Sequence, residues 1–446
     1  MGMHPFTRGW AVAVAIALLP AMLVPGAARA AIEIVERTSP GGIVFWHMEE
    51  PSIPMVALEV SVAGGAALDP AENAGAANMA MSLMDEGAGE RDASAFAAEA
   101  ERLSARFGFS ASRDRVSVSA RMLVENLDAS AGLMAEALAS PRFDAEAVER
   151  VRGQILSNLA SEETDPRDVA GKAWYARAFP GHPYGRPTDG TPDSVAALTR
   201  EDLVAAHGRL LNRARATVGV VGALDAEAAG VLVDTVLAGL PAEAPSEAAL
   251  PASPAAAPPP GVEIVDLPVP QSQVILGHAG LDRDDPDYIP AYVMNYVLGG
   301  GGFSSRLMTE VREKRGLAYG VYAYLADLEG APLYISGVAT ANDRVAESIE
   351  VIRAEWARMA SEGVSDEELA KAKQYLTGAF PLRFDTNAKI ARFMVAAQEA
   401  GLDVDYVEIR NGLIEAVTRE DIARVAARVL QPEALSVIVV GQPAGL

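Results

Sequence analysis

The sequence predicts an α+β protein that contains two copies of one domain. Apolar strand patterns alternate with long amphipathic helices, motifs recur in the two halves at a nearly constant spacing, and a proline-rich segment separates the copies. The chain has 446 residues, of which 50% are hydrophobic, so it is long enough for two or three packed domains. We therefore expect each copy to form a mostly antiparallel sheet with helices packed on one face.

The first thirty residues have the composition of a secretory signal. Arg8 precedes an uncharged apolar run over residues 10–24, and Ala28-Arg29-Ala30 offers the small residues that a signal peptidase requires. Pro20 interrupts this run and Pro25 ends it, and the run is shorter than the roughly 20 residues needed to span a bilayer. We therefore interpret 1–30 as a signal peptide cleaved before Ala31, not as a membrane anchor. This predicts an exported protein without stable membrane insertion, periplasmic in a Gram-negative source.

A segment rich in proline and alanine divides the remaining chain into nearly equal halves. Residues 241–260 contain seven prolines and no aromatic residue. Such a composition cannot bury a core and favours extended polyproline II structure. We interpret this segment as a linker between an N-terminal domain, 31–240, and a C-terminal domain, 261–446.

Two features recur in both halves in the same order. In one, Thr-Arg-Glu-Asp opens a helical stretch that leads to an apolar strand; in the other, an apolar strand precedes an Asp-Pro pair and a helix. Matched order and spacing indicate a duplicated domain. The paired copies are Thr199 and Thr418, the strands 216–222 and 435–441, and the strands 56–62 and 274–278.

Hydrophobic periodicity predicts the other elements. Alternating or continuous apolar residues predict strands over 115–120, 319–324 and 333–338. Helical spacing of apolar residues predicts helices over 93–107, 145–161 and 365–380, and Ser365 is the expected N-cap of the last one.

The composition excludes several classes of function. With 37 basic and 60 acidic residues the formal charge is −23, so nucleic acid is not an expected partner. The absence of cysteine removes thiol catalysis, disulfides and cysteine-bound zinc. No two of the four histidines after the signal stand three to five residues apart, which favours structural roles. These histidines are His47, His182, His207 and His278.

The most distinctive stretch begins with Gly299-Gly300-Gly301-Gly302 and continues to Tyr322. Four glycines permit positive φ and a close backbone approach. Ser304 or Ser305 can cap a short basic helix that ends at Gly316 and leads into a strand. A phosphate-binding loop is not supported, because the Gly-Lys-Ser/Thr ending is missing and no strand precedes the glycines.

The run from Gly299 to Tyr322 closely resembles the C-terminal half-domain of the pitrilysin, insulysin and mitochondrial-processing-peptidase family of zinc peptidases, in its small bacterial two-domain form. Residues 179–185 and 368–378 and the β-rich ending of each half support the resemblance, which covers essentially all of 31–446. It implies two domains that face each other across a cavity.

The resemblance also implies that this chain has lost a metal site. The family's peptidases carry H-x-x-E-H on a helix of the first half, where two histidines bind zinc and the glutamate is the general base. Here Asn78, Met81 and Ser82 stand at the corresponding positions. Val151 and Asn158 occupy the positions of the supporting and zinc-binding glutamates. Amide, hydroxyl and thioether groups are poor zinc donors, so we expect no metal in this chain.

A second part of the family's active site is retained. In active members an arginine and a tyrosine seven residues apart reach toward the substrate carbonyl, and the matching residues here are Arg312 and Tyr319. Guanidinium and phenol groups are suitable donors to a developing oxyanion. The alternative interpretation is a solvated basic helix followed by a packed strand aromatic.

The resemblance thus implies the non-catalytic subunit of a heterodimeric periplasmic zinc metallopeptidase. A homologous partner with H-x-x-E-H would hold the zinc, and this chain would complete the site and bind an unfolded peptide as an added edge strand. Two alternatives remain open: a structural or binding protein of the same fold without a peptidase role, and a stand-alone hydrolase with an unrecognised site.

Overall fold

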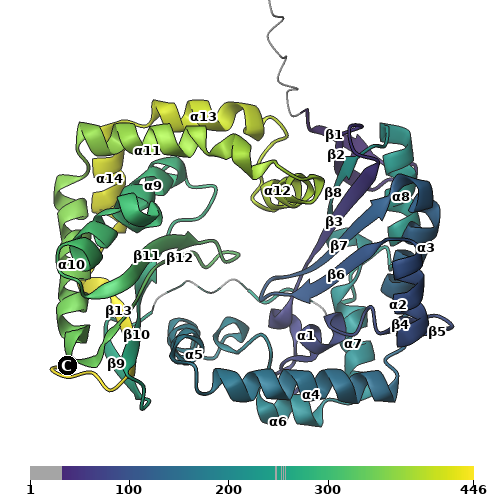
Figure 1. The fold of residues 1–446 in the computed structure, drawn as a ribbon, viewed down its shortest axis with the longest axis horizontal. Helices are drawn as coiled ribbons and strands as arrows, with labels where there is room; N and C mark the ends of the chain where they lie inside the picture. Colours follow the sequence, from purple (N-terminus) through teal and green to yellow (C-terminus); the bar gives the residue numbers. More distant parts are fainter. Residues whose placement is uncertain (1–32, 247–248, 253, 255, 257) are drawn as a thin grey trace, which may run out of the picture. The chain divides into compact units, whose positions relative to one another are not determined.

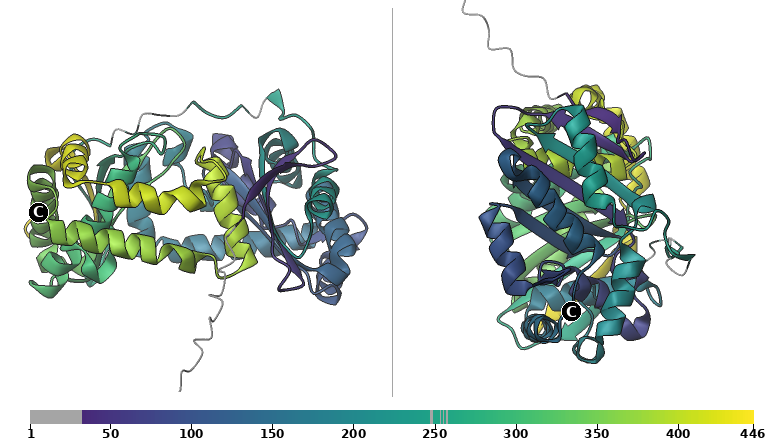
Figure 2. Two further views of the ribbon diagram at one scale, coloured as in Figure 1. Left: turned by 90° about the horizontal axis from the view of Figure 1, so that it is seen from above. Right: turned by 90° about the vertical axis from the view of Figure 1, so that its right-hand side faces the viewer.

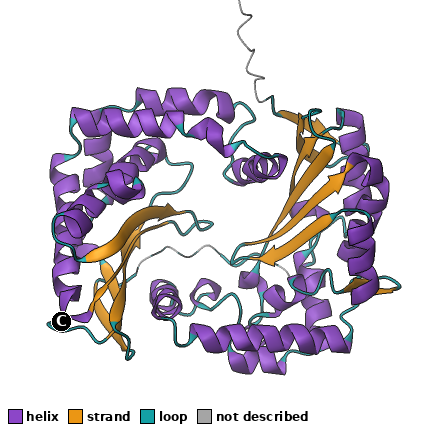
Figure 3. Cartoon of the chain, viewed as in Figure 1, coloured by secondary structure: helices purple, strands orange, loops and turns teal. Residues whose placement is uncertain are grey.

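The structure, a computed structural model, describes residues 33–446 apart from 247–248, 253, 255 and 257. The predicted signal peptide 1–30 lies outside the described residues. The described chain contains two large sheets, each covered by helices, and one small two-stranded sheet (Figures 1 and 3). The predicted α+β class with two related domains is therefore confirmed.

The N-terminal half contains a sheet of order β1-β2-β8-β3-β7-β6, in which the β2–β8 pair is parallel and the other pairs are antiparallel. Its strands are β1 (Val35–Thr38), β2 (Val44–Glu49), β3 (Met55–Ala63), β6 (Arg106–Ala111), β7 (Arg115–Leu123) and β8 (Ala216–Gly222). A separate hairpin consists of β4 (Gly87–Ala88) and β5 (Arg91–Asp92). Its helices are α1 (Ala76–Met81), α2 (Ala93–Arg102), α3 (Leu127–Ala139), α4 (Ala145–Glu162), α5 (Pro166–Ala178), α6 (Pro192–Ala197), α7 (Arg200–Leu210) and α8 (Ala226–Leu237).

The C-terminal half repeats this topology with the sheet order β11-β12-β10-β13-β9, in which only the β13–β9 pair is parallel. Its strands are β9 (Gly261–Asp266), β10 (Gln271–Ala279), β11 (Ala318–Ala326), β12 (Leu333–Ala341) and β13 (Ser436–Gly441). Its helices are α9 (Tyr288–Asn295), α10 (Val345–Glu362), α11 (Asp366–Gly378), α12 (Asn387–Glu399), α13 (Tyr406–Ala416) and α14 (Arg419–Val429). Two π-helical turns, Tyr296–Gly300 and Met308–Glu313, lie between α9 and β11.

The repeated Thr-Arg-Glu-Asp motif has a clear physical role. Thr199 accepts a hydrogen bond from the Asp202 backbone N–H at the start of α7, and Thr418 does the same with Asp421 at the start of α14. The aspartate side chain in turn accepts from the threonine backbone N–H, so each motif forms a capping box. The sequence repeat therefore marks the same helix start in both halves.

One predicted helix is wrong in part. The helix expected over 93–107 ends at Arg102, and 106–111 forms β6, which pairs with β7. Ser104 has φ +53°, a left-handed conformation that ends the helix and redirects the chain. Phe107 still packs near Phe96, with ring centroids 6.2 Å apart, which explains why its spacing resembles that of a helix.

Each sheet packs its own helices on one face, and one helix from the other half lies on the opposite face (Figure 1). Val56, Leu58 and Val60 of β3 face the N-terminal core with α3 and α8. The opposite face of β3 and β8 is covered by α12, whose Gln398 donates to the Val218 carbonyl at 3.1 Å. Reciprocally, Trp174 of α5 packs on Gly277 of β10. The two halves are thus joined by an exchange of helices.

The described residues of the predicted linker 241–260 contact the N-terminal half. Arg177 of α5 donates to the Pro259 carbonyl at 3.1 Å, and His182 Nε2 lies 3.1 Å from the Ala252 carbonyl oxygen. Figure 2 shows the described parts of this segment between the two halves. Across the described part of the chain, none of the helices combines the length and apolar character that crossing a bilayer requires.

Candidate functional site

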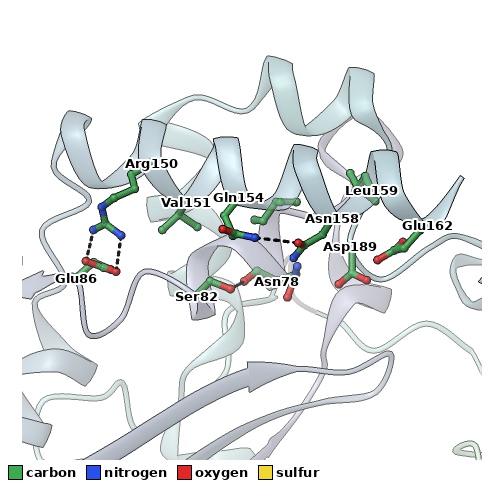
Figure 4. A pocket seen from close by; sticks show the side chains of 11 residues that line it. Asn78, Ser82, Glu86, Arg150, Val151, Gln154, Asn158, Leu159, Glu162 and Asp189 are labelled. Atoms are coloured by element: carbon green, nitrogen blue, oxygen red, sulfur yellow. Dashed lines mark hydrogen bonds and ion pairs between the residues drawn. The ribbon is translucent and has the colours of Figure 1, made fainter. Parts of the chain in front are cut away.

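Four of the residues singled out at the lost metal site line one cavity of about 570 Å³. Asn78 and Ser82 come from α1 and its C-terminal end, and Val151 and Asn158 come from α4. Gln154 and Asn158 project from α4 toward Asn78 and Ser82 (Figure 4). Met81 is different, because it is 1% exposed and belongs to the hydrophobic core.

The polar groups of this cavity bond to one another. Gln154 Nε2 donates to Asn158 Oδ1 at 2.9 Å, and the Ser82 hydroxyl donates to the Asn78 carbonyl at 2.9 Å. The Arg150–Glu86 ion pair lies at one end of the cavity and Asp189 at the other (Figure 4). Burial raises the pKa of the Asp189 carboxyl.

The donor set does not fit zinc. Among the described residues no three histidine, cysteine or carboxylate side chains come close enough together to hold a metal ion. The groups that meet between α1 and α4 are three amides and a hydroxyl, which bind Zn²⁺ weakly. We therefore derive no zinc chemistry from this cavity.

Three of the histidines, His47, His207 and His278, make hydrogen bonds that fit a structural role. His207 Nε2 lies 2.8 Å from the Leu138 carbonyl oxygen, and His278 Nε2 accepts from the Trp356 indole at 3.0 Å. His47 Nε2 lies 3.1 Å from the Leu224 carbonyl oxygen. Burial lowers the pKa of all three imidazoles, which favours their neutral form.

The glycine segment packs the first π-helical turn against β11. A Cβ at Gly299 would lie 2.6 Å from the Ala323 backbone nitrogen, so only glycine allows this approach. Gly302 has φ +54°, which glycine adopts without strain. Gly300 and Gly301 continue the turn, Ser305 accepts from the Met308 N–H, and the basic turn ends before Gly316. These contacts place Arg312 and Tyr319 on adjoining elements.

Three basic residues, Arg312, Lys314 and Arg315, lie close together here. Of these three, Arg312 alone has no acidic partner among the described residues. Lys314 and Arg315 both pair with the buried Glu310, at 2.7 and 2.6 Å, and these cations lower the pKa of Glu310. Arg312 instead places its guanidinium 4.6 Å from the Phe303 ring centroid. Its N–H donors make no hydrogen bond with a described residue, so they are open to solvent or to a further group.

Tyr319 is 86% exposed on β11, an edge strand of the C-terminal sheet. Its hydroxyl makes no hydrogen bond with a described residue. Sequence reasoning missed three further exposed aromatics nearby, Phe303, Tyr322 and Tyr324, of which the last two stack at 6.0 Å. The alternation of Tyr322 and Tyr324 along β11 was the available signal, because residues two apart share a strand face.

Two models of known protein families match this chain. Residues 45–192 match the family model described as Insulinase (Peptidase family M16), and residues 197–376 match the model described as Peptidase M16 inactive domain. The two models of one family therefore account for most of the chain.

Two similar proteins illustrate the range of relatives. A Streptomyces coelicolor protein named as an uncharacterized zinc protease is 29% identical, over 91% of this chain and 90% of that protein. A Helicobacter pylori protein named as the non-peptidase homolog YmxG is 26% identical, over 76% of this chain and 78% of that protein.

A solved structure agrees with this relationship. The crystal structure of a peptidase M16 inactive domain from Pseudomonas fluorescens is 27% identical, has a TM-score of 0.86, and matches 92% of this chain and 98% of that chain. The fold, the two family models and the unsuitable donor set lead to one conclusion. The chain belongs to the M16 peptidase family, and it is a non-catalytic member of that family.

Proposed function

We propose that this protein is the substrate-binding and site-completing subunit of a heterodimeric zinc metallopeptidase that cleaves unfolded peptides in the periplasm. The observation that carries the proposal is the pair Arg312 and Tyr319. Both retain unused donors, while the adjacent Lys314 and Arg315 share an ion pair with Glu310. A protein with only a structural role has no physical need to keep such donors free.

The proposed division of labour follows from the donor sets. A homologous partner with H-x-x-E-H would supply the zinc and the general base, which the cavity between α1 and α4 cannot supply here. Arg312 and Tyr319 would donate hydrogen bonds to the oxyanion that develops on the peptide carbonyl. The free edge of β11 presents backbone groups to an extended peptide, which gives affinity with little demand on sequence.

The first experiment is affinity purification of the mature chain from its native periplasm, with protein identification and zinc analysis. We expect a near-equimolar relative that carries H-x-x-E-H, and about one zinc per pair. A chain that emerges alone and free of zinc would favour the alternative, a binding or structural protein of the same fold.

A mutation then tests the roles of the pair. We expect Arg312→Ala to lower kcat/KM of the complex by roughly 10²- to 10³-fold, the usual cost of one oxyanion donor. The complex should still assemble, as judged by gel filtration. Arg344→Ala is the matched control, because Arg344 is an exposed arginine on another element. Full activity of the Arg312→Ala complex would refute the assignment.

A further inference from the structure

A second cavity lies between the N-terminal sheet and the start of α12. It has a volume of about 610 Å³, within the range of small-ligand sites. Strand β3 and the turn before it form one wall, and α12 with the residues before it forms the other. Arg121 of β7 and Arg392 of α12 both line this cavity. It shares no lining residue with the cavity between α1 and α4.

The two arginines have no anionic partner. Neither Arg121 nor Arg392 forms an ion pair or donates a hydrogen bond to a described residue. Of the other charged lining groups, Lys389 and Asp385 form an ion pair at 2.7 Å, and Glu50, which accepts from the Ser52 N–H at 2.9 Å, keeps a single negative charge against the two arginines. In a protein with a net charge of −23, two guanidinium groups left unpaired at one cavity leave a local excess of positive charge.

The nearest buried carboxyl does not cancel this charge. Glu59 on β3 is 7% exposed, and it attracts Arg392 and Arg121 without reaching ion-pair distance. Its burial raises the pKa of the carboxyl to about 7, so it is largely protonated in mildly acidic solution. The first turn of α12, capped by Thr386, adds the positive end of a helix to the same wall.

The remaining lining combines the polar Ser52, Thr386 and Asn387 with an apolar part. Ile53, which is 52% exposed, stands with Met55 and Phe384 around the cavity. A ligand that matches both parts must combine an anionic group with an apolar side chain. An arginine pair favours a planar carboxylate, which it can bind through paired N–H donors.

We propose that this cavity binds the C-terminal carboxylate of a peptide between Arg121 and Arg392, with the last side chain against Ile53 and Phe384. The inference rests on the proposed function in one respect, namely that peptides are the ligands of this protein. It assigns an anchoring role to a place distinct from Arg312 and Tyr319, and it predicts a preference for a free carboxyl end.

Isothermal titration calorimetry on the isolated mature chain at pH 6 tests the proposal. The two ligands are N-acetyl-alanyl-phenylalanine and its C-terminal amide, which differ only in the charged group. We expect the carboxylate to bind at least about tenfold more tightly than the amide. Arg121→Ala and Arg392→Ala should each abolish that preference, whereas Arg344→Ala should keep it.

Three results would overturn the proposal: equal binding of the two ligands, binding of neither, or an unchanged preference in both arginine variants. The variants replace exposed side chains, and a retained thermal unfolding temperature shows that they fold. Because the assay needs neither a partner nor zinc, its failure is separate from failure of the proposed subunit role, which activity of the Arg312→Ala complex decides.

Discussion

At the scale of single residues, the structure around Arg312 depends on the lack of a side chain at Gly299. Gly299 touches the backbone of Ala323 closely enough that any side chain would collide with it. The contact holds the π-helical turns against β11, so the position of Arg312 relative to Tyr319 depends on it. Gly299 is thus required to position the candidate residues Arg312 and Tyr319.

We therefore expect Gly299→Ala to destabilise the fold by roughly 1–3 kcal/mol, the usual cost of forcing atoms into a packed core. Gly320→Ala is the matched control, because a Cβ at Gly320 meets nothing within 4 Å. Urea unfolding of both variants measures the difference. Equal stability of the two variants would show that the turn relaxes freely and that the close approach imposes no constraint.

The sequence allowed part of this site to be predicted. Arg312 and Tyr319 were identified because a linear motif carries them. The pairing of Lys314 and Arg315 with Glu310 was not, because a buried carboxylate is recognised only once the surrounding elements are in place. The unpaired Arg121 and Arg392 were missed for the same reason, since β7 and α12 are more than 260 residues apart along the chain.

At the scale of elements, the two capping boxes explain why the halves share a motif. Each satisfies two backbone N–H groups that a helix start would otherwise leave without partners. The motif is therefore a local signal, and helix starts at 199 and 418 could be predicted from the sequence. The end of α2 could not, because β6 forms a hairpin with β7, and this strand pairing overrides the helical spacing of Phe107.

Thr199→Ala and Thr418→Ala should each lower the free energy of unfolding by about 1 kcal/mol, the typical loss for an N-cap. Thr235→Ala serves as the control, because Thr235 lies inside α8 and its hydroxyl bonds only to the Val231 carbonyl of the same helix. Chemical denaturation followed by circular dichroism compares the three variants. A loss in the control as large as in the cap variants would contradict the capping explanation.

At the scale of the whole molecule, the exchange of α5 and α12 joins the halves. Trp174 lies in the apolar cluster with Ile335 and Ile438 of the C-terminal sheet, and α12 lies on β3 and β8 of the N-terminal sheet. Hydrophobic periodicity predicts that a helix has an apolar face but not which sheet that face covers. This exchange therefore could not be predicted from the sequence, although the duplication could.

The contact between α12 and β3 buries Glu59, so we expect the stability of the protein to depend on pH through this carboxyl. Burial has the largest effect on its pKa, and it outweighs the attraction of Arg392 from α12 and Arg121 from β7. Glu399 of α12 repels the carboxylate, so the pKa of Glu59 rises from 4.5 to about 7. The folded state then binds this proton more tightly than the unfolded state does. Its contribution to stability is present below pH 4.5 and is lost as the pH rises through about 7.

Glu59→Gln removes the titrating group and keeps its shape. The variant should match the wild type at pH 4 and exceed its unfolding free energy at pH 8 by up to about 3 kcal/mol, which corresponds to the full pKa difference. Urea unfolding across this pH range measures the gap between the two proteins. Asp85→Asn is a useful comparison, because burial also raises the pKa of that carboxyl, yet Asp85 lies outside the α12 contact. A gap that is independent of pH for Glu59→Gln would show that the carboxyl titrates alike in both states, so that the contact between the halves would carry no pH dependence from this residue.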